Sequence, residues 1–373
     1  ARADRDVRKF LSRISRDNPS ARVVLTGCYT ERHAEEVRQH PQVWQVLRNR
    51  EKEGLAERIL AEFGPQAGTS SALYRSRALI KIQDGCDFRC TFCIIPFVRG
   101  RSVSVPPDKI LAQVRDLVQR GYREIVLTGI HINSYGRDRE PTCSLLDLIK
   151  QIERIEGLGR VRLSSLDPRF LDSDFVDHVA ANPRICPHFH ISLQHASNAV
   201  LRKMGRDIGQ DEYRRILREI REKNPDASLG ADLIVGFPGE TDEDFKVLLD
   251  FCERAPLSYF HVFSYSPRPD TPASRSPQVK EHIKKERARL LQTLTERKRA
   301  SFQRRFIGRK TEGVVIKRSR DGAEILTPHY LKVWVPECPQ RESEDVQVQI
   351  TSVSGRSLVG QVIDHEKDHP SPS

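Results

Sequence analysis

Three cysteines lie within eight residues of one another, in the segment DGCDFRCTFC. They are Cys86, Cys90 and Cys93, separated by three and then by two residues. Thiolate sulfur is a soft ligand that suits iron, and three thiolates on one short loop can ligate three irons of a [4Fe–4S] cube. Because no fourth cysteine closes the site, one iron keeps an exchangeable position, where the amine and carboxylate of an amino acid could chelate. The spacing therefore predicts an iron–sulfur centre with an open coordination position.

A structural zinc site is the main alternative for this segment. Structural zinc takes four ligands, commonly supplied as two Cys-x-x-Cys pairs. The sequence has no second pair, and His131 is too far along the chain to complete a zinc finger. The iron–sulfur interpretation is therefore preferred.

The other five of the eight cysteines are scattered along the chain. Cys28 follows a glycine turn at the end of a short expected strand. The remaining four have no partner at ligand spacing, and we expect each to be a small buried hydrophobic residue. These four are Cys143, Cys186, Cys252 and Cys338.

Strand and helix patterns alternate after residue 77. Six strands are expected, at residues 78–83, 124–128, 160–164, 189–194, 228–235 and 259–265. Helices are expected near residues 107–120, 144–155, 172–180, 211–223 and 241–252, the last with Thr241 as its N-cap and Asp244 at its third position. This alternation predicts an α/β fold with a parallel sheet, curved into a partial (β/α)6 barrel. In such barrels the chemistry sits on loops at the C-terminal strand ends, and the three-cysteine segment leaves the first strand.

Smaller parts flank the barrel. Residues 1–63 contain a helix and a strand at 21–27, which indicate a short α/β piece, and residues 64–76 form a linker rich in Gly, Pro and Ser. The barrel domain takes residues 77–306 and ends in a long basic helix at 280–306. Five short strand patterns in residues 307–364 predict a small β-barrel of the oligonucleotide-binding sort. Residues 365–373 are expected to be a disordered tail.

Positive charge is concentrated near the end of the barrel domain. The net charge is +11, and residues 275–310 alone hold thirteen Lys and Arg against three Glu. A concentrated basic segment suggests a polyanionic partner such as nucleic acid. The alternative is a solvated, charge-rich helix.

The composition is that of a soluble globular protein, with 38% hydrophobic and 30% charged residues. No run approaches the roughly 20 apolar residues of a membrane span, and no basic-then-apolar leader opens the chain, so we expect a cytoplasmic protein. The sequence begins with Ala1, and its one methionine is Met204. From this we expect an N-terminally incomplete or processed chain.

Six motifs spread along nearly the whole chain resemble one family. They are LTGCY around Cys28, IQDGCDFRCTFCIIPFVRGR, EIVLTGIHINSYGRD at 124–138, RLSSLDP at 162–168, GADLIVGFPGETDEDF at 230–245 and FHVFSYSPRPDTPA at 260–273. In order and spacing they resemble the methylthiotransferase branch of the radical-SAM superfamily. The cysteine segment is most similar to the MtaB type, which acts on N6-threonylcarbamoyladenosine of tRNA. The tail resembles the RNA-binding TRAM module, and residues 1–63 resemble the C-terminal part of the family's Rossmann-like N-terminal domain.

The resemblance implies a reaction and its cofactors. A [4Fe–4S] cluster on the three cysteines would cleave S-adenosylmethionine (SAM) to a 5′-deoxyadenosyl radical, which abstracts hydrogen from C2 of the adenine. An auxiliary [4Fe–4S] cluster would supply sulfur, and a second SAM the methyl group. The implied partners are tRNA and an external flavodoxin- or ferredoxin-like electron donor, and we expect a monomer with no membrane association.

The resemblance also implies SAM contacts. Phe92 would lie against the adenine, and Thr128 and Gly129 would present backbone to the methionine amine. The other three are polar residues that also fit satisfied core or capping roles. They are Gln194 for the ribose, Arg206 for the SAM carboxylate and Asp232 on the adenine side.

Two departures from the family pattern stand out. The family's auxiliary cluster uses three N-terminal cysteines, of which this chain has Cys28 alone, so we expect the complete auxiliary cluster to be lacking. The family usually has Gln-Ser-Gly-Ser where this chain has Gln194, His195, Ala196 and Ser197. We expect His195 to be packed and hydrogen-bonded.

Other functions fit part of this pattern. A sibling enzyme would keep the mechanism and act on isopentenyladenosine of tRNA or on an aspartate of a ribosomal protein; the basic helix and the TRAM-like tail favour tRNA. A function of a different class is a non-catalytic RNA-binding protein with a structural cluster.

Overall fold

The computed structural model describes residues 2–52, 54–64 and 76–363. The chain forms two compact units. The cysteine unit comprises residues 1–72, 85–101 and 266–276, and the barrel unit comprises residues 73–84, 102–265 and 277–373. The expected linker lies almost wholly outside the described residues, and so does the expected tail. No helix in the described ranges is both long and apolar enough to cross a membrane.

A small α/β arrangement makes up the first part of the cysteine unit. Its elements are α1 (Arg2–Asp17), β1 (Val23–Thr26), α2 (Thr30–Arg38), β2 (Val43–Leu47), the 3-10 turn η1 (Asn49–Glu51) and α3 (Leu55–Phe63). β1 and β2 pair in parallel, and Ala34 and Val37 of α2 pack with Val46 of β2. The expected first helix and strand are confirmed. β2 and α3 were not predicted, because short polar segments carry little periodicity.

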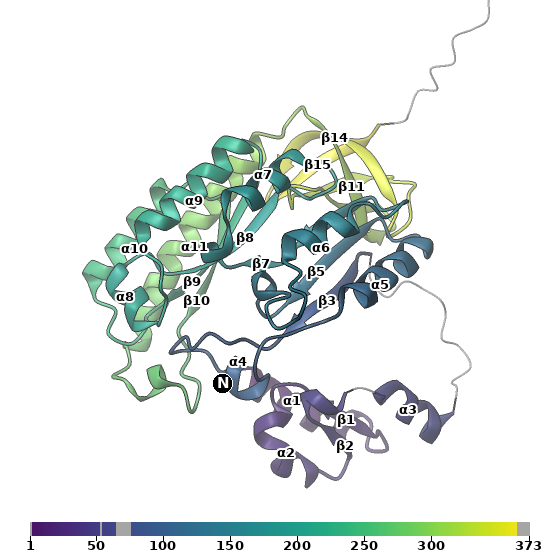
Figure 1. Cartoon of the computed structure of the whole chain (residues 1–373), viewed down its shortest axis with the longest axis vertical. Helices are drawn as coiled ribbons and strands as arrows, with labels where there is room; N and C mark the ends of the chain where they lie inside the picture. Colours follow the sequence, from purple (N-terminus) through teal and green to yellow (C-terminus); the bar gives the residue numbers. More distant parts are fainter. Residues whose placement is uncertain (1, 53, 65–75, 364–373) are drawn as a thin grey trace, which may run out of the picture. The chain divides into compact units, whose positions relative to one another are not determined.

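Parallel strands form the core of the barrel unit (Figure 1). They are β3 (Ala78–Asp84), β5 (Glu124–Gly129), β6 (Arg160–Leu163), β7 (Ser165–Leu166), β8 (His188–Gln194), β9 (Ser228–Val235) and β10 (Tyr259–Ser264). They lie in two sheets, ordered β4-β3-β5-β6 and β10-β9-β8-β7, with the short β4 (Val103–Ser104) antiparallel to β3. The third expected strand is divided at Ser164, so β6 pairs with β5 and β7 with β8. The predicted α/β fold with a partial barrel of parallel strands is confirmed.

Helices cover the outer faces of these sheets. They are α5 (Pro107–Gln119), α6 (Leu145–Ile152), α7 (Ser173–Ala181), α8 (Asn198–Lys203), α9 (Gln210–Lys223), α10 (Asp242–Arg254) and α11 (Glu281–Arg304). Figure 1 shows α5 and α6 beside β3 and β5, and α9, α10 and α11 beside β8, β9 and β10. Alternate strand residues such as Leu229, Ala231 and Leu233 are fully buried in the core of the unit. As predicted, Thr241 caps α10 and accepts from the backbone N–H of Asp244.

A second, small barrel follows α11. Its strands are β11 (Lys310–Ser319), β12 (Gly322–Leu326), β13 (Lys332–Pro336), β14 (Asp345–Ser354) and β15 (Ser357–Val362), closed in the order β11-β12-β13-β15-β14. Inward-facing residues such as Val315, Ile325 and Val348 have no exposed surface. The predicted five-stranded β-barrel is therefore confirmed.

A buried arginine joins the two barrels. Arg162 of β6 donates to the two carboxylate oxygens of Glu124 at 2.7 and 3.1 Å. It also donates to the carbonyl oxygens of Thr327 and Pro328, which follow β12, both at 3.0 Å. Burial alone would raise the pKa of Glu124, but the Arg162 guanidinium outweighs it, and the pKa lies below its ordinary value.

Three of the four scattered cysteines behave as expected. Cys186, Cys252 and Cys338 are buried. Cys143 is partly exposed, because it lies in the loop before α6 and not on an inward-facing strand position.

Candidate functional site

The three expected iron ligands lie on one closed loop of the cysteine unit. The loop follows β3 and begins at Gly85, whose φ is +73°. A Cβ at this position would lie 1.9 Å from the carbonyl oxygen of Arg101, so only glycine lets the two ends of the loop meet. The backbone N–H of Cys86 closes the loop by donating to the carbonyl of Gly100 at 3.1 Å.

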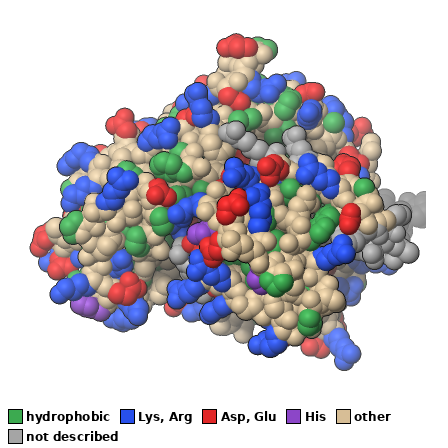
Figure 2. Space-filling model, turned by 90° about the horizontal axis from the view of Figure 1, so that it is seen from below, with side chains coloured by type: hydrophobic (Ala, Val, Ile, Leu, Met, Phe, Trp, Pro, Cys, Tyr) green, Lys and Arg blue, Asp and Glu red, His purple; other side chains and the backbone are tan. Residues whose placement is uncertain are grey.

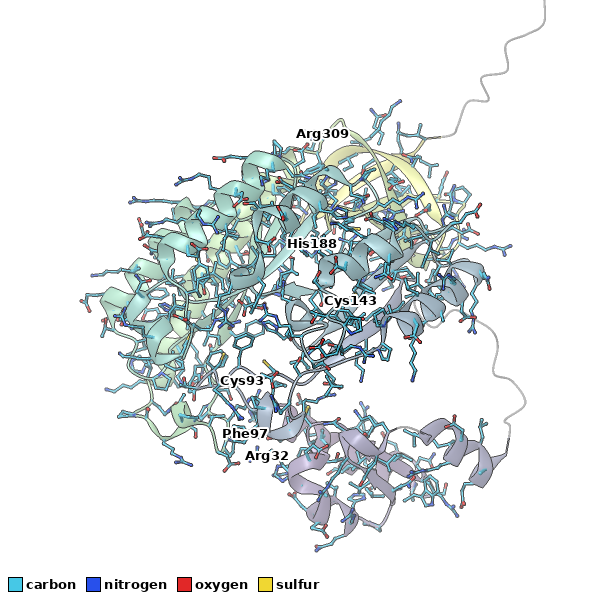
Figure 3. The ribbon with its side chains drawn as sticks, in the orientation of Figure 1. Arg32, Cys93, Phe97, Cys143, His188 and Arg309 are labelled. Atoms are coloured by element: carbon cyan, nitrogen blue, oxygen red, sulfur yellow. The ribbon has the colours of Figure 1, made fainter. Side chains whose placement is uncertain are left out.

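The loop leaves its three thiols available. None of the three forms a disulfide with a described residue and all three are partly exposed, and Figure 3 shows Cys93 just before the short helix α4 (Ile95–Val98). Phe92, beside it, is partly buried. Burial raises the pKa of Cys93 to about 11, so this group is a thiol until a metal displaces its proton.

The donor set of the loop distinguishes between metals. Structural zinc takes four ligands, and this loop supplies three cysteines. An all-sulfur set of three thiolates fits an iron–sulfur cube, in which each thiolate has its own iron.

Cys28 lies in the same unit as this loop. It follows Gly27, whose φ of +113° ends the β1 segment. The Cys28 Sγ accepts a hydrogen bond of 3.3 Å from Nε of Arg99, at the end of the three-cysteine loop. The contact was not predicted, because it joins residues far apart in the chain.

Thr128 and Gly129 lie at the C-terminal end of β5, as expected. A Cβ on Gly129 would lie 2.8 Å from the carbonyl oxygen of Gln83, so the close approach at this glycine is to β3 of the same sheet. Gln83 is fully buried; its amide donates to Ser102 at 2.8 Å and accepts from the backbone N–H of His131 at 2.8 Å. This buried glutamine was not recognised from the sequence, in which it is one polar residue in a strand.

Gln194 ends β8 in a strained conformation. Its φ is +69°, a region that side-chain-bearing residues rarely adopt. Its side chain is partly exposed and has no hydrogen-bond partner within the described residues. The next residue, His195, is fully buried and accepts from the backbone N–H of Ser197 at 2.9 Å, so the expectation of a packed, hydrogen-bonded histidine is confirmed.

Arg206 belongs to a buried polar network. It donates to Asp167 at 3.1 Å and to the carbonyl of Ser192 at 2.8 Å. Asp167 also pairs with Arg169 at 2.7 Å and with Nε2 of His131 at 3.2 Å. Burial would raise the pKa of Asp167, but these partners hold it far below its usual range. Asp167 lies in the RLSSLDP motif, which was the one sequence signal for it.

Asp232 lies in the middle of β9 and not at its end. Its Oδ1 lies 3.0 Å from Nε2 of His190 on β8 and 3.4 Å from Nδ1 of His261 on β10. Burial would raise its pKa, but the two imidazoles hold it well below the ordinary value, so the group is a carboxylate. The sequence predicted neither histidine, because the three residues meet only through the order of the strands.

Comparison with known proteins agrees with this geometry. The family model for the radical SAM superfamily matches residues 80–252. The radical SAM methyltransferase TsrM from Kitasatospora setae has a similar fold, with a TM-score of 0.56 and 18% identity over 73% of this chain and 60% of that one.

Curated relatives match over most of their length. Threonylcarbamoyladenosine tRNA methylthiotransferase MtaB of Aquifex aeolicus is 37% identical over 88% of this chain and 83% of the relative. The MtaB protein of Chlamydia pneumoniae is 33% identical over 97% and 86%. The tRNA-2-methylthio-N(6)-dimethylallyladenosine synthase of a Ruegeria species is 30% identical over 94% and 84%. With its three-cysteine loop, its partial barrel and these relatives, the chain belongs to the radical-SAM tRNA methylthiotransferases.

Proposed function

We propose that this protein adds a methylthio group to C2 of N6-threonylcarbamoyladenosine next to the anticodon of tRNA. The observation that carries the reaction is the closed loop of three available cysteines that follows β3. The choice of adenosine is supported by four MtaB relatives at 33–37% identity. Three relatives named for dimethylallyladenosine are 30–36% identical, which makes that adenosine the alternative substrate.

The proposed site residues fall into two groups, one that binds the cluster and one that contacts SAM. Family membership implies a [4Fe–4S] cluster and SAM. We assign the cluster to Cys86, Cys90 and Cys93; when bound, it supplies the electron that cleaves SAM reductively. The remaining SAM contacts follow the family pattern. They are Phe92 for the adenine, the backbone of Thr128 and Gly129 for the methionine amine, the Gln194 amide for the ribose, Arg206 for the carboxylate and Asp232 for the adenine side.

Cys28 is proposed as one ligand of an auxiliary cluster that supplies sulfur. Cys28 is partly exposed, and its Sγ accepts a hydrogen bond from Nε of Arg99 in the three-cysteine loop. Residues 1–85 contain no second cysteine that could be another ligand of such a cluster.

Replacing Gln194 with Gly is expected to stabilise the barrel unit while weakening SAM binding. A positive φ costs a non-glycine residue on the order of 1 kcal/mol, which glycine avoids. The backbone at Gln194 is strained, and its side-chain amide has no partner among the described residues. Both features are typical of a residue that contacts a ligand. Unfolding midpoints and calorimetric titration with SAM measure the two effects.

The matched control is Gln194→Ala, which loses the amide but keeps the strained backbone. It should lose SAM affinity like the glycine variant and gain no stability. Equal midpoints for the two variants, or unchanged SAM affinity in both, would contradict the assignment.

Many cations of the basic segment are already paired within the protein. On α11, Lys284 and Arg287 are buried: Lys284 donates to the Tyr265 carbonyl, and Arg287 pairs with Asp242. Others pair with surface acids, as Arg297 does with Glu253 and as Arg305 and Arg309 do with Asp226. In Figure 2, Lys and Arg side chains are spread over the visible face among Asp and Glu. Fewer cations of this segment are therefore available to bind RNA than its net charge suggests.

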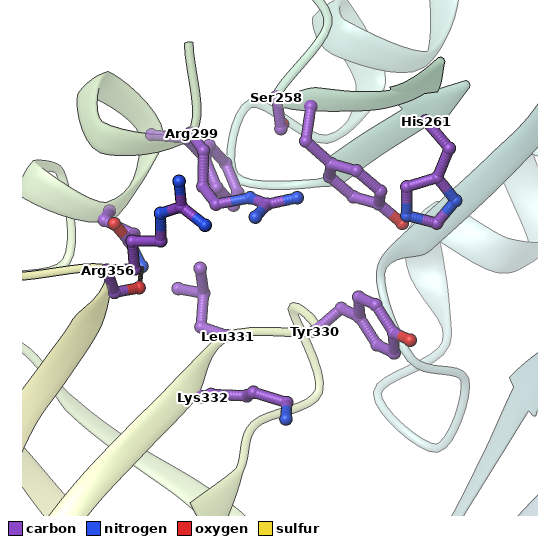
Figure 4. A pocket seen from close by; sticks show the side chains of 10 residues that line it. Ser258, His261, Arg299, Tyr330, Leu331, Lys332 and Arg356 are labelled. Atoms are coloured by element: carbon purple, nitrogen blue, oxygen red, sulfur yellow. Dashed lines mark hydrogen bonds between the residues drawn. The ribbon is translucent and has the colours of Figure 1, made fainter. Parts of the chain in front are cut away.

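One pocket is lined by three cations, of which Lys332 pairs with Glu324 and Arg356 with Glu296 outside the pocket, while Arg299 has no such acid among the described residues. A pocket of about 170 Å³ lies between α11, the start of β10 and the small barrel, and Figure 4 shows Arg299, Lys332 and Arg356 around it. Its lining includes the rings of Tyr259 and Tyr330 and no carboxylate. Tyr330 also stacks on His188, with the ring centroids 4.3 Å apart, and Figure 3 labels this histidine. Cations beside aromatic rings are the surface that RNA phosphates and bases prefer.

Replacing Arg299 with Ala is expected to weaken tRNA binding about fivefold to tenfold at low salt. No carboxylate of the described residues pairs with Arg299, so its charge is available to a phosphate. Loss of one phosphate contact should lower the slope of log affinity against log salt by roughly 0.7–0.9. Fluorescence polarisation with tRNA at several salt concentrations measures both changes.

Arg289→Ala is the control, because Arg289 is an exposed residue of the same helix that lies outside the pocket. Its effect should be small. Equal losses in the two variants would mean that α11 contributes only general charge.

Nucleoside analysis tests the proposed reaction as a whole. Cells that lack the gene should lose 2-methylthio-N6-threonylcarbamoyladenosine from tRNA, and a plasmid copy should restore it. Loss of the 2-methylthio dimethylallyl nucleoside in its place would assign the alternative substrate.

A further inference from the structure

The inner face of β8, β9 and β10 is open to solvent in the middle of the barrel. Alternate residues of these strands face either the covering helices or the lumen. On the helix side, Leu233 and Phe260 are at most 1% exposed. On the lumen side, Phe263 is 52% exposed, and the side chains of His261 and Asp232 are 48% and 22% exposed. These lumen-side groups are therefore accessible to a ligand.

A carboxylate held by two imidazoles lines this open part. His190 and His261 approach the same oxygen, Oδ1 of Asp232, from the two neighbouring strands. The second nitrogen of His190 lies 3.2 Å from the hydroxyl of Tyr259, so this histidine is held from both sides. Oδ2 of Asp232 and Nε2 of His261 have no partner within the described residues. One acceptor and one imidazole nitrogen are thus left for a ligand.

The depth of Asp232 and His261 below the barrel rim matches the position of the N6 substituent of the proposed substrate. His261 lies three residues before Ser264, the end of β10, which places it about 10 Å below the C-terminal rim at 3.3 Å per residue. Chemistry in such barrels takes place at that rim. In a purine that presents C2 there, C6 is only two ring bonds away, so an extended N6 substituent can reach to this depth.

The chemistry of the group discriminates between the two candidate adenosines. A threonylcarbamoyl substituent has N–H groups and a hydroxyl, which can donate to Oδ2 of Asp232 and to Nε2 of His261. A dimethylallyl substituent is hydrocarbon and would leave both groups desolvated without partners. A site that hydrogen-bonds a substituent strongly rejects analogues that lack its polar groups. An apolar pocket discriminates much less between ligands of similar shape.

We infer that Asp232 and His261 are specificity-determining residues that select a polar, hydrogen-bonding N6 substituent on the substrate adenosine. His190 is a positioning residue that fixes the carboxylate. The inference rests on the proposed function and deepens it. It places Asp232 against the substrate, a different partner from the SAM adenine that the family pattern implies.

The same three residues also have the donor set of a two-histidine, one-carboxylate metal site, since their ligand atoms lie within 4.8 Å of one another. The geometry favours the metal-free arrangement, because each imidazole nitrogen directly faces the carboxylate oxygen at 3.0 and 3.4 Å. A divalent ion at this position is a separate outcome of the test.

The test compares three anticodon stem-loop RNAs of one sequence, bound to the cluster-loaded full chain in the presence of SAM. The adenosine next to the anticodon is unmodified, N6-threonylcarbamoylated or N6-dimethylallylated. The unaltered protein should bind the threonylcarbamoyl RNA more tightly than the other two. His261→Phe, which keeps a ring and removes both nitrogens, should reduce this preference at least tenfold, and His261→Gln should restore part of it.

His282→Phe is the matched control, since His282 is an exposed residue of α11. It should leave the preference unchanged, and SAM cleavage without RNA should be the same in His282→Phe as in the unaltered protein. An unchanged preference in His261→Phe would overturn the inference and leave the proposed function standing. If the unaltered protein does not prefer the threonylcarbamoyl RNA, the proposed substrate is wrong and the inference falls with it. A stoichiometric divalent ion other than iron that is lost in His261→Phe would reassign the group as a metal site and would also overturn the inference.

Discussion

Replacing any one of Cys86, Cys90 and Cys93 with Ala is expected to reduce SAM cleavage to background and to remove most of the iron bound by this loop. The closed loop offers three thiols and no fourth cysteine, so each substitution leaves a cube with two protein ligands. Such a cube exposes a second iron and is readily lost. Anaerobic reconstitution, iron and sulfide analysis, and the yield of 5′-deoxyadenosine after reduction measure the effect.

Cys143→Ala is the control for this experiment. Cys143 is also partly exposed and forms no disulfide with a described residue, but it lies in the loop before α6. Its replacement should leave the iron content and SAM cleavage unchanged. Iron retention and cleavage at the parent rate in a triple variant without Cys86, Cys90 and Cys93 would remove the basis of the proposed function.

Replacing Glu124 with Gln is expected to destabilise the barrel unit by about 3–5 kcal/mol, because the substitution leaves the Arg162 charge buried without its main partner. Arg162 also holds the carbonyls of Thr327 and Pro328, so the small barrel should lose its attachment together with this pair. Urea unfolding followed by the fluorescence of Trp334 on β13 reports on that barrel. A Trp44→Phe background leaves Trp334 as the one tryptophan of the chain.

The matched control is Glu212→Gln, which breaks the exposed pair with Arg215 at 2.7 Å and should cost at most about 1 kcal/mol. Lowering the pH should destabilise the protein in the same way as Glu124→Gln. The pKa of Glu124 is depressed in the folded protein, so its contribution is fully present above the pKa of an unfolded glutamate, about 4.3, and is lost as pH falls through the folded value. Equal shifts in the urea midpoint for Glu124→Gln and Glu212→Gln would refute the role given to the buried pair.

Contiguous patterns were enough to predict most of the architecture. The alternation of strands and helices, the capping pair Thr241 and Asp244 and the five short strands of the tail are local features, and all three are confirmed. The break at Ser164 was not predictable, because it depends on which neighbouring strand offers backbone partners on each side. The exposure of Cys143 depends likewise on its place between elements.

For the site, the sequence by itself determined what lies close along the chain. The spacing of Cys86, Cys90 and Cys93 predicted the metal chemistry, because a short loop brings neighbouring residues together whatever surrounds it. Only the tertiary structure decided the contacts of Asp167 with Arg206 and of Asp232 with His190 and His261. It also decided which cations of α11 are free, since Lys284 and Arg287 are buried and Arg299 faces a pocket. The physical reason is that parallel strands meet side by side in an order that periodicity does not encode, so residues far apart in the chain become neighbours only when the sheet forms.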